Sequence, residues 1–260
     1  MTQQTPNAGA ILWENWQQRR RIDQLPSDCR PVDRAAGYTA QREMVKCSGQ
    51  DVVGWKIAAT SSAGQKHIGV DGPLAGPLLA NRVLADGATV PLEGNIMMVG
   101  EAEFAFKFAA ALPRRENPYT QDEVLNAVES LHPAIEVPDS RYNDFVKVGA
   151  PQLIADTACA DWFVLGAPTS DDWRSRDLIA HRVVVFLNGE NVAMGSGANV
   201  LGDPRIALTW LVNELRTYGD GIEAGQFVTT GTCVVPVPIQ RGDTLRADFG
   251  DLGTVGVKLG

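Results

Sequence analysis

The chain has 260 residues, of which 44% are hydrophobic and 21% are charged, and its formal net charge is −8. This composition is typical of a globular protein with an ample core, built as one large domain or as a small and a large one. The negative charge argues against nucleic acid as a partner, because the only basic run, Arg19–Arg21, is more simply the solvated face of a helix.

Neither membrane insertion nor secretion finds support in the sequence. No apolar run reaches the length that crosses a membrane, and residues 1–10 are polar where a secretion signal would have an apolar core. The four cysteines stand far apart with no C-x-x-C pair, which argues against a zinc site and predicts reduced thiols. We therefore expect a cytoplasmic protein with no membrane partner.

Residues 1–50 are predicted to form a helical region that packs on the body of the protein. Apolar residues recur at helical spacing from Ile11 to Trp16, and a second helix is predicted over residues 32–47, with Gly49 after its end. Residues 51–260 are predicted to form a β-rich catalytic domain. The two parts are expected to work as one functional domain.

Short runs of apolar and β-branched residues predict a sheet in this second part. The Asn188-Gly189 pair is typical of a hairpin turn, and the glycine-rich stretch Gly69–Gly76 is expected to be a loop. From Phe227 to Leu259, β-branched residues alternate with turns that contain Gly and Asp. The predicted strands before that tail cover residues 52–57, 97–108, 134–137, 161–165 and 181–187.

Two helices are predicted within the β-rich part. Thr120 is a good N-cap for a helix over Gln121–Leu131, and Glu123 stands three residues later, as in a capping box. The other helix covers Pro204–Tyr218, with leucines along one side and Gly219 after its end. The residues alone thus predict a mixed, β-rich fold with a helical N-terminal arm.

The acidic residues of the strand at 97–108 are the first candidates for a functional site. Glu101 and Glu103 alternate along a strand, so both side chains are expected on one face, where they would repel each other unless a cation lies between them. Glu136, in the apolar setting Pro-Ala-Ile, supplies a third acid. Three carboxylates predict a Mg²⁺ or Mn²⁺ site with positions left open for a substrate. The alternative is a polar edge strand with solvated carboxylates.

Lys56 is the candidate cation beside these acids. It lies within a predicted strand between Trp55 and Ile57, and lysine is rarely buried unless it is paired. Near the acids it could form an ion pair, bind a substrate carboxylate or move a proton. A lysine whose charge reaches the surface is the alternative. The Gly231-Thr232 pair could present backbone N–H groups to a carboxylate, or could simply end a strand.

An ordered set of short motifs, each weak alone but specific together, runs from about residue 50 to the end of the chain. With this set, the sequence resembles the 2-keto-4-pentenoate hydratase and 4-oxalocrotonate decarboxylase group of the fumarylacetoacetate hydrolase superfamily. The motifs are Gly54–Ile57, Gly69–Asp71, Glu101–Phe106, Pro133–Glu136, Asp139–Arg141, Ala155–Thr157, Val200–Gly202, Gly242–Thr244 and Ala247–Phe249.

The resemblance implies an α+β fold, a mixed β-roll of the fumarylacetoacetate hydrolase C-terminal-domain type with a helical N-terminal region. It implies a lyase that uses Mg²⁺ or Mn²⁺ and acts on a 2-oxo or 2-hydroxydienoic acid from aromatic breakdown, as a hydratase or decarboxylase working through an enolate. Relatives form homo-oligomers, so we expect a homo-oligomer, and association with another enzyme of the pathway is a further expectation.

Site residues carry over from this resemblance by position. The metal ligands fall on Glu101, Glu103 and Glu136, and the active-site lysine falls on Lys56. Substrate contacts are expected from two further residues, Ile57 and Thr232.

One departure from the family pattern bears on the reaction. Typical hydratases have an acid for proton transfer where this chain has Leu74. A leucine cannot move a proton, so either Asp71, taken here as a catalytic candidate, or a water takes its place, or the reaction is not the usual hydration. The alternatives are a C–C bond hydrolase or tautomerase of a related oxo acid, and a non-catalytic subunit that completes an assembly.

Overall fold

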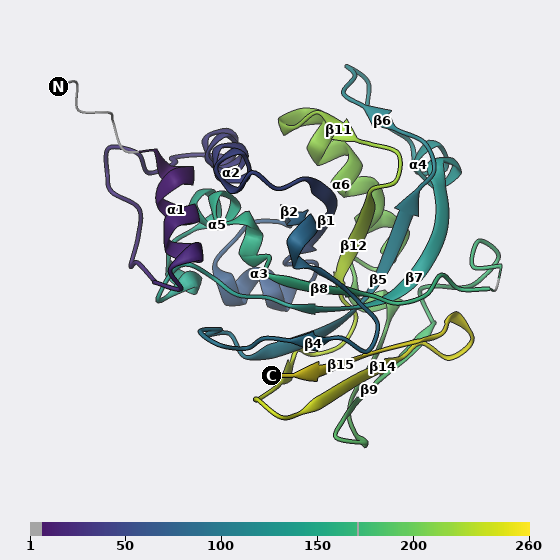
Figure 1. The fold of residues 1–260 in the computed structure, drawn as a ribbon. Helices are drawn as coiled ribbons and strands as arrows, with labels where there is room; N and C mark the ends of the chain where they lie inside the picture. Colours follow the sequence, from purple (N-terminus) through teal and green to yellow (C-terminus); the bar gives the residue numbers. More distant parts are fainter. Residues whose placement is uncertain (1–6, 171) are drawn as a thin grey trace.

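A computed structural model describes residues 7–170 and 172–260 of the chain, and it has the expected α+β fold, a curled mixed sheet with helices packed around it (Figure 1). Within this described part, the larger sheet runs in the order β2-β1-β12-β5-β7-β8-β3, and β13 pairs with β5. Its strands are β1 Val52–Ala58, β2 Leu74–Leu79, β3 Val83–Ala85, β5 Val99–Phe108, β7 Val128–Val137, β8 Trp162–Leu165, β12 Phe227–Thr232 and β13 Val237–Pro238.

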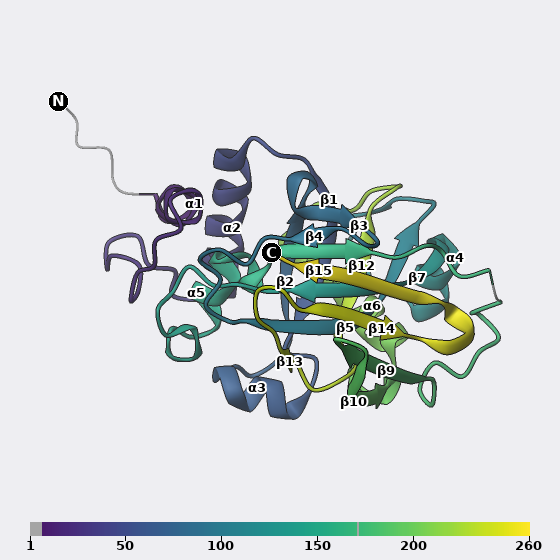
Figure 2. The ribbon, with the colours of Figure 1, turned by 60° about the horizontal axis from the view of Figure 1, so that its bottom comes forward.

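A second sheet packs on the first. It runs in the order β10-β9-β14-β15-β4, and Figure 2 shows β14 and β15 lying across the larger sheet, where they contact β7. A short pair, β6 with β11, lies apart from both sheets. These strands are β4 Thr89–Val90, β6 Leu112–Pro113, β9 Arg182–Leu187, β10 Glu190–Ser196, β11 Gly221–Ile222, β14 Thr244–Asp248 and β15 Thr254–Leu259.

The helices lie around this β body. They are α1 Ala8–Gln17, α2 Arg34–Ser48, α3 Ser62–Ile68, α4 Gln121–Ala127, α5 Ala150–Ala155 and α6 Pro204–Tyr218. Short 3₁₀ turns cover Ala80–Arg82, Phe145–Lys147, Thr157–Cys159, Gly197–Asn199 and Gly250–Leu252. None of the helices in the described residues is long and apolar enough to cross a membrane.

The N-terminal helices gather at one end of the molecule, where α1 packs on α2 and both contact α5 (Figure 1). The side chain of Asp33 caps the first turn of α2, and Gly49 ends this helix in the left-handed conformation that glycine adopts easily. The predicted helix at 32–47 is therefore present, shifted by one or two residues. The link between α1 and α2 is not helical, although the sequence predicted a mostly helical segment there.

The main core lies between α6 and the larger sheet. The predicted bounds of α6 are confirmed, and its buried residues include Leu208, Leu211 and Leu215. They share a core with strand residues such as Phe104 and Phe106. Fully burying one such side chain contributes about 1.5–3 kcal/mol, so this face of the sheet is firmly anchored. Site residues on the same strands must then alternate onto the opposite face.

One predicted helix end is wrong. The helix expected over Gln121–Leu131 ends at Ala127, because Val128–Leu131 begins β7 and pairs with the end of β5. The capping box at Thr120 is confirmed, so the local signal for the helix start holds while tertiary pairing sets its end. The predicted Asn188-Gly189 hairpin is also confirmed, with both residues at positive φ.

The glycine-rich stretch Gly69–Gly76 is only partly a loop. Gly69 ends a short helix, α3, that the sequence analysis did not predict, and Leu74 already begins β2. The strand forms because residues 74–79 are buried along their whole length and pair with β1. Gly76 lies opposite Lys56 in this pairing. The sheet thus brings the predicted loop residues to the wall that contains the lysine.

Gly76 has no room for a side chain. A Cβ atom there would lie 1.8 Å from the carbonyl oxygen of Thr157, a backbone atom that cannot rotate away. We expect Gly76→Ala to lower the free energy of unfolding by about 1–3 kcal/mol, as overpacking does in cores. Urea unfolding measures the change. Gly72→Ala, where nothing lies within 4 Å of the added atom, is the matched control, and an equal loss in both variants would contradict the prediction.

Candidate metal centre

The three predicted acids come together in the structure. Glu101 pairs directly with Glu136 across β5 and β7, and Glu103 follows two residues later on the same face of β5. One carboxylate oxygen from each of the three residues lies within 4.8 Å of the others. Glu103 and Glu136 are fully buried, and Glu101 is partly exposed. The alternative of a solvated edge strand is therefore excluded.

Glu103 is held in place from the neighbouring strand. One of its oxygens, Oε2, accepts a hydrogen bond from the hydroxyl of Thr229 and another, at 2.9 Å, from the backbone N–H of Gly231. The other oxygen, Oε1, is buried and accepts none from the described residues, and the same is true of Glu136 Oε2. Buried oxygens without a donor are costly in a folded protein, so these atoms point to a cationic ligand.

Lys56 is the cation of this site. Its side chain is only 3% exposed, and its Nζ lies 3.0 Å from Glu136 Oε1. The ammonium group also donates a hydrogen bond of 3.0 Å to the carbonyl oxygen of Ala158. The alternative of a lysine that reaches the surface is thus wrong. When all three carboxylates are ionised, as metal ligands must be, one ammonium group leaves two negative charges uncompensated.

The pKa values reflect this crowding. Burial, followed by repulsion from Glu136, raises the pKa of Glu101 to about 7, and the same causes raise the pKa of Glu103 well above its ordinary value. Burial also raises the pKa of Glu136, although Lys56 opposes it. Burial alone would lower the pKa of Lys56, but the three carboxylates outweigh burial and raise it. In the metal-free protein, Lys56 is therefore an ammonium ion at neutral pH.

This donor set fits a small divalent cation. All three donors are carboxylate oxygens, the ligands that Mg²⁺ and Mn²⁺ prefer, and two of the buried oxygens have no other partner. Two positive charges would match the two that the site lacks. Three protein ligands would also leave positions for water or for two oxygens of a substrate.

Three other predicted site residues have different surroundings. Ile57 follows Lys56 in β1, so its side chain lies on the opposite face, buried in the main core. Thr232 pairs with Glu103, and its hydroxyl donates to the carbonyl of Val234. Asp71 is exposed between α3 and β2. Substrate contact by Ile57 and Thr232, and a catalytic role for Asp71, stay predictions.

Leu74 lies where it can influence the site. It pairs with Ala58, two residues from Lys56 along β1, so Leu74 and Lys56 share one face of the sheet. The side chain of Leu74 is completely buried. The position that would hold an acid in typical hydratases therefore presents an apolar group on the face of the lysine.

Two groups that contact the site residues, the hydroxyl of Thr229 and the carbonyl of Ala158, were not predicted from the sequence. Thr229 pairs with Ala105, two residues from Glu103, across β12 and β5, and this pairing places its hydroxyl against Glu103. The carbonyl of Ala158 comes from a separate turn, without any motif to mark it. The Gly231-Thr232 pair predicted backbone N–H groups that bind a carboxylate, and this is found for Gly231. The N–H of Gly231 binds the carboxylate of Glu103, a residue of the protein itself.

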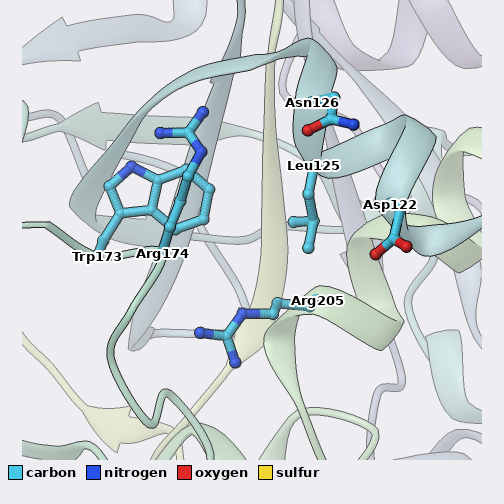
Figure 3. Close-up of a pocket in the computed structure, with 6 residues that line it drawn as sticks. All are labelled: Asp122, Leu125, Asn126, Trp173, Arg174 and Arg205. Atoms are coloured by element: carbon cyan, nitrogen blue, oxygen red, sulfur yellow. The ribbon is translucent and has the colours of Figure 1, made fainter.

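A surface pocket of about 290 Å³ lies away from the carboxylates, between α4, the start of α6 and the loop after β8 (Figure 3). Its two guanidinium groups are already engaged with the protein. Arg174 stacks on Trp173 and donates to the carbonyl of Val128, while Arg205 donates to the carbonyl of Arg176. The pocket includes none of the predicted site residues, and we assign it no function.

Comparison with known proteins identifies the family. Residues 75–259 match the model described as fumarylacetoacetate (FAA) hydrolase C-terminal, which covers more than half of the chain and most of both sheets. The chain belongs to the fumarylacetoacetate hydrolase family. The predicted resemblance and the predicted β-roll fold are thereby confirmed.

Individual relatives narrow the likeness to one group. The chain is 31% identical over 251 residues to 2-oxo-hept-4-ene-1,7-dioate hydratase of Escherichia coli, covering 93% of this chain and 92% of the relative. It is 33% identical over 240 residues to 2-keto-4-pentenoate hydratase of Burkholderia vietnamiensis, covering 91% and 90%. A solved structure, 4-oxalocrotonate decarboxylase of Pseudomonas putida complexed with magnesium and adipate, superposes with a TM-score of 0.85 at 30% identity, covering 96% and 97%.

The raised pKa of Glu101 predicts how pH affects the metal-free protein. The pKa of an unfolded glutamate is near 4.5, so between pH 4.5 and about 7 the unfolded chain has lost this proton while the folded protein still holds it. The free energy of unfolding therefore falls as pH rises through this window. In the presence of a chelator, we expect Glu101→Gln to be more stable than the wild type at about pH 8, with the difference closing as pH falls toward 4.5. Urea unfolding at several pH values measures it.

Glu129→Gln is the control for this prediction. Glu129 also lies in this sheet, but its side chain is 53% exposed and pairs with Lys107 at the surface. Its replacement should change stability by less than about 0.5 kcal/mol at any pH. A stability gain in Glu101→Gln that does not depend on pH would contradict the explanation.

Proposed function

We propose that this protein is a divalent-metal-dependent lyase that acts on a 2-oxo acid, or on its 2-hydroxydienoic form, through an enolate. The observation that supports the proposal most directly is the set of three converging carboxylates, with two unpaired buried oxygens, beside the buried Lys56. The names of the relatives, which are hydratases and decarboxylases of such acids, agree with it. Mg²⁺ is the proposed cofactor, with Mn²⁺ as the alternative, and one solved relative contains magnesium.

Glu101, Glu103 and Glu136 would hold the metal. When bound, Mg²⁺ would polarise the 2-oxo group of the substrate and favour the negative charge of the enolate. Thr229 and Gly231 fix the carboxylate of Glu103, so this ligand need not reorganise when the metal or the substrate arrives.

Lys56 would supply positive charge beside the carboxylates. As an ammonium ion, it can bind the carboxylate of a substrate or donate a proton. Asp71 and a water molecule are further candidates for proton transfer. We also propose substrate contacts by Thr232, beside Glu103, and through the backbone of Ile57.

The second candidate function is a C–C bond hydrolase or a tautomerase of a related oxo acid. Leu74 is the observation that supports it, because an apolar side chain stands on the face of Lys56 where hydration would use an acid. The metal and the enolate would be the same in both cases. The products separate them: one hydrated acid indicates a hydratase, carbon dioxide a decarboxylase, two acid fragments a hydrolase, and an isomer a tautomerase.

The purified protein is expected to turn over 2-hydroxypenta-2,4-dienoate or 2-oxo-3-hexenedioate in the presence of Mg²⁺ and to lose this activity in a chelator. Glu103→Gln should lower kcat/KM by about 10²–10³-fold, since it removes the negative charge of one proposed metal ligand in the reacting centre. Substrate absorbance and product analysis measure both effects, with Glu129→Gln as an active control. No turnover and no stabilisation by Mg²⁺ would contradict the proposal and favour a non-catalytic assembly subunit.

The hydroxyl of Thr229 should matter for the metal more than for the fold. Thr229→Val keeps the shape of the side chain but removes the donor to Glu103. We expect it to weaken Mg²⁺ binding by about 10–100-fold, as loss of a partner that orients a ligand does. Titration calorimetry measures the affinity. Thr230→Val, which removes a hydrogen bond to the carbonyl of Phe104 instead, is the matched control, and equal losses would refute the role of the hydroxyl.

Self-association is the remaining part of the proposal. Membership of the fumarylacetoacetate hydrolase family, whose members form homo-oligomers, supports contacts between copies of this chain. We propose a homo-oligomer, and association with another enzyme of the same pathway is its extension. The mass from light scattering tests the first statement.

A further inference from the structure

A completely buried ion pair lies next to the metal centre without belonging to it. The side chains of Arg141 and Asp156 are both 0% exposed, and Arg141 Nε donates to Asp156 Oδ1. The other carboxylate oxygen, Oδ2, accepts from the Ser140 hydroxyl at 2.8 Å and from the backbone N–H of Arg141 at 3.0 Å. Every oxygen of this carboxylate is thus satisfied, which makes the pair a rigid unit.

The guanidinium group of Arg141 also donates hydrogen bonds to the backbone from Asp156 onward. It donates to the carbonyl of Asp156 at 2.6 Å and to the carbonyl of Ala160 at 3.1 Å. A further hydrogen bond of 2.9 Å reaches the hydroxyl of Thr157. Arg141 therefore holds both ends of the segment between these two carbonyls. The planar fork of arginine donors suits this task, and a lysine could not reproduce it.

The segment that is held in this way is strained. Thr157, Ala158 and Cys159 have φ values of 54°, 52° and 63°, three consecutive left-handed residues without a glycine among them. Non-glycine residues rarely adopt this conformation, and it persists only where the surroundings enforce it. Gly76 contributes by leaving space for the carbonyl of Thr157. Residues 157–159 are called the left-handed turn below.

The left-handed turn points one carbonyl at the active-site lysine. Ala158, its middle residue, accepts the hydrogen bond of 3.0 Å from Lys56 Nζ. Lys56 is thus fixed between this carbonyl and Glu136 Oε1. In a regular right-handed turn the carbonyl of Ala158 would point elsewhere, and the ammonium group would lose one of its two anchors.

We propose that Arg141, paired with Asp156, is a positioning residue that enforces the left-handed turn and thereby places the ammonium group of Lys56 at the metal centre. Helix α1 takes part, because the ring of Trp16 covers the guanidinium group of Arg141 at 4.3 Å and donates to Asp161. The N-terminal helices would thus support catalysis through this contact. The expected effect on kcat rests on the proposed function, whereas the effect on the position of Lys56 does not.

Arg141→Lys is the variant that tests the proposal. It keeps the charge opposite Asp156 but removes the fork that holds both carbonyls. We expect a folded protein with Mg²⁺ affinity near that of the wild type and kcat lowered by about 10²-fold, as a small displacement of a reacting group can cause. Arg82→Lys is the matched control. Arg82 also lies on Trp16 and pairs with Asp161, yet it donates no hydrogen bond to the left-handed turn in the described structure. It should keep the wild-type kcat.

A second readout does not depend on activity. Acetic anhydride labels lysine amines, and mass spectrometry of the peptides gives the rate at each lysine, with Lys147, which is 80% exposed, as the internal reference. Lys56 should be protected in the wild type and in Arg82→Lys, and should react about tenfold faster in Arg141→Lys, where it has lost a restraining hydrogen bond. Thr157→Val removes the hydroxyl that accepts from Arg141 and donates to the carbonyl of Asp156. It keeps the other hydrogen bonds of Arg141, so it should shift both readouts in the same direction, but by less.

Each outcome decides between the explanations. If folded Arg141→Lys keeps the wild-type kcat and the protection of Lys56, the proposal is wrong. It is also wrong if Mg²⁺ affinity and activity fall together while Lys56 stays protected, since Arg141 would then act on the carboxylates. If Arg141→Lys does not fold, Thr157→Val supplies the same comparison. If the wild type shows no turnover, the proposed function fails, and the labelling rates still test the inference.

Discussion

Three carboxylates that converge on one wall of a rolled sheet, two of them fully buried, are the constraint that the rest of this structure accommodates. Burying even one ionised carboxylate costs several kcal/mol, and here Glu101, Glu103 and Glu136 also repel one another. The pairing of β5 with β7 gives them no way to separate, because it places Glu101 opposite Glu136. Lys56 offsets one charge, so the fold leaves a deficit that matches a divalent cation.

The groups around the carboxylates hold the site side chains in fixed positions more than they stabilise the fold. Thr229 and Gly231 fix one oxygen of Glu103, while Lys56 is anchored by a carbonyl from the left-handed turn. That turn is itself unfavourable, and a buried ion pair maintains it. A site built in this way is organised before any ligand arrives, which is what electrostatic stabilisation of an enolate requires.

The sequence was informative where function and fold depend on local pattern. The alternation of Glu101 and Glu103 predicted their common face, and the apolar periodicity of Pro204–Tyr218 predicted α6. It was uninformative where distant pairing decides. Val128–Leu131 continues a good helix signal but joins a strand, because β5 offers it a partner. The anchor at Ala158 is a backbone carbonyl, which no side-chain motif can mark.

Leu74 shows why the carboxylates alone do not determine the reaction. Hydration, decarboxylation and C–C hydrolysis of a 2-oxo acid can all pass through the same enolate, so one set of ligands can serve each of them. They differ in how protons and water reach the substrate. Leu74 provides no proton on the face of Lys56. The relatives, which include hydratases and decarboxylases at similar identity, fit this view. Specificity within this fold therefore lies in the groups that surround the enolate rather than in those that hold the metal.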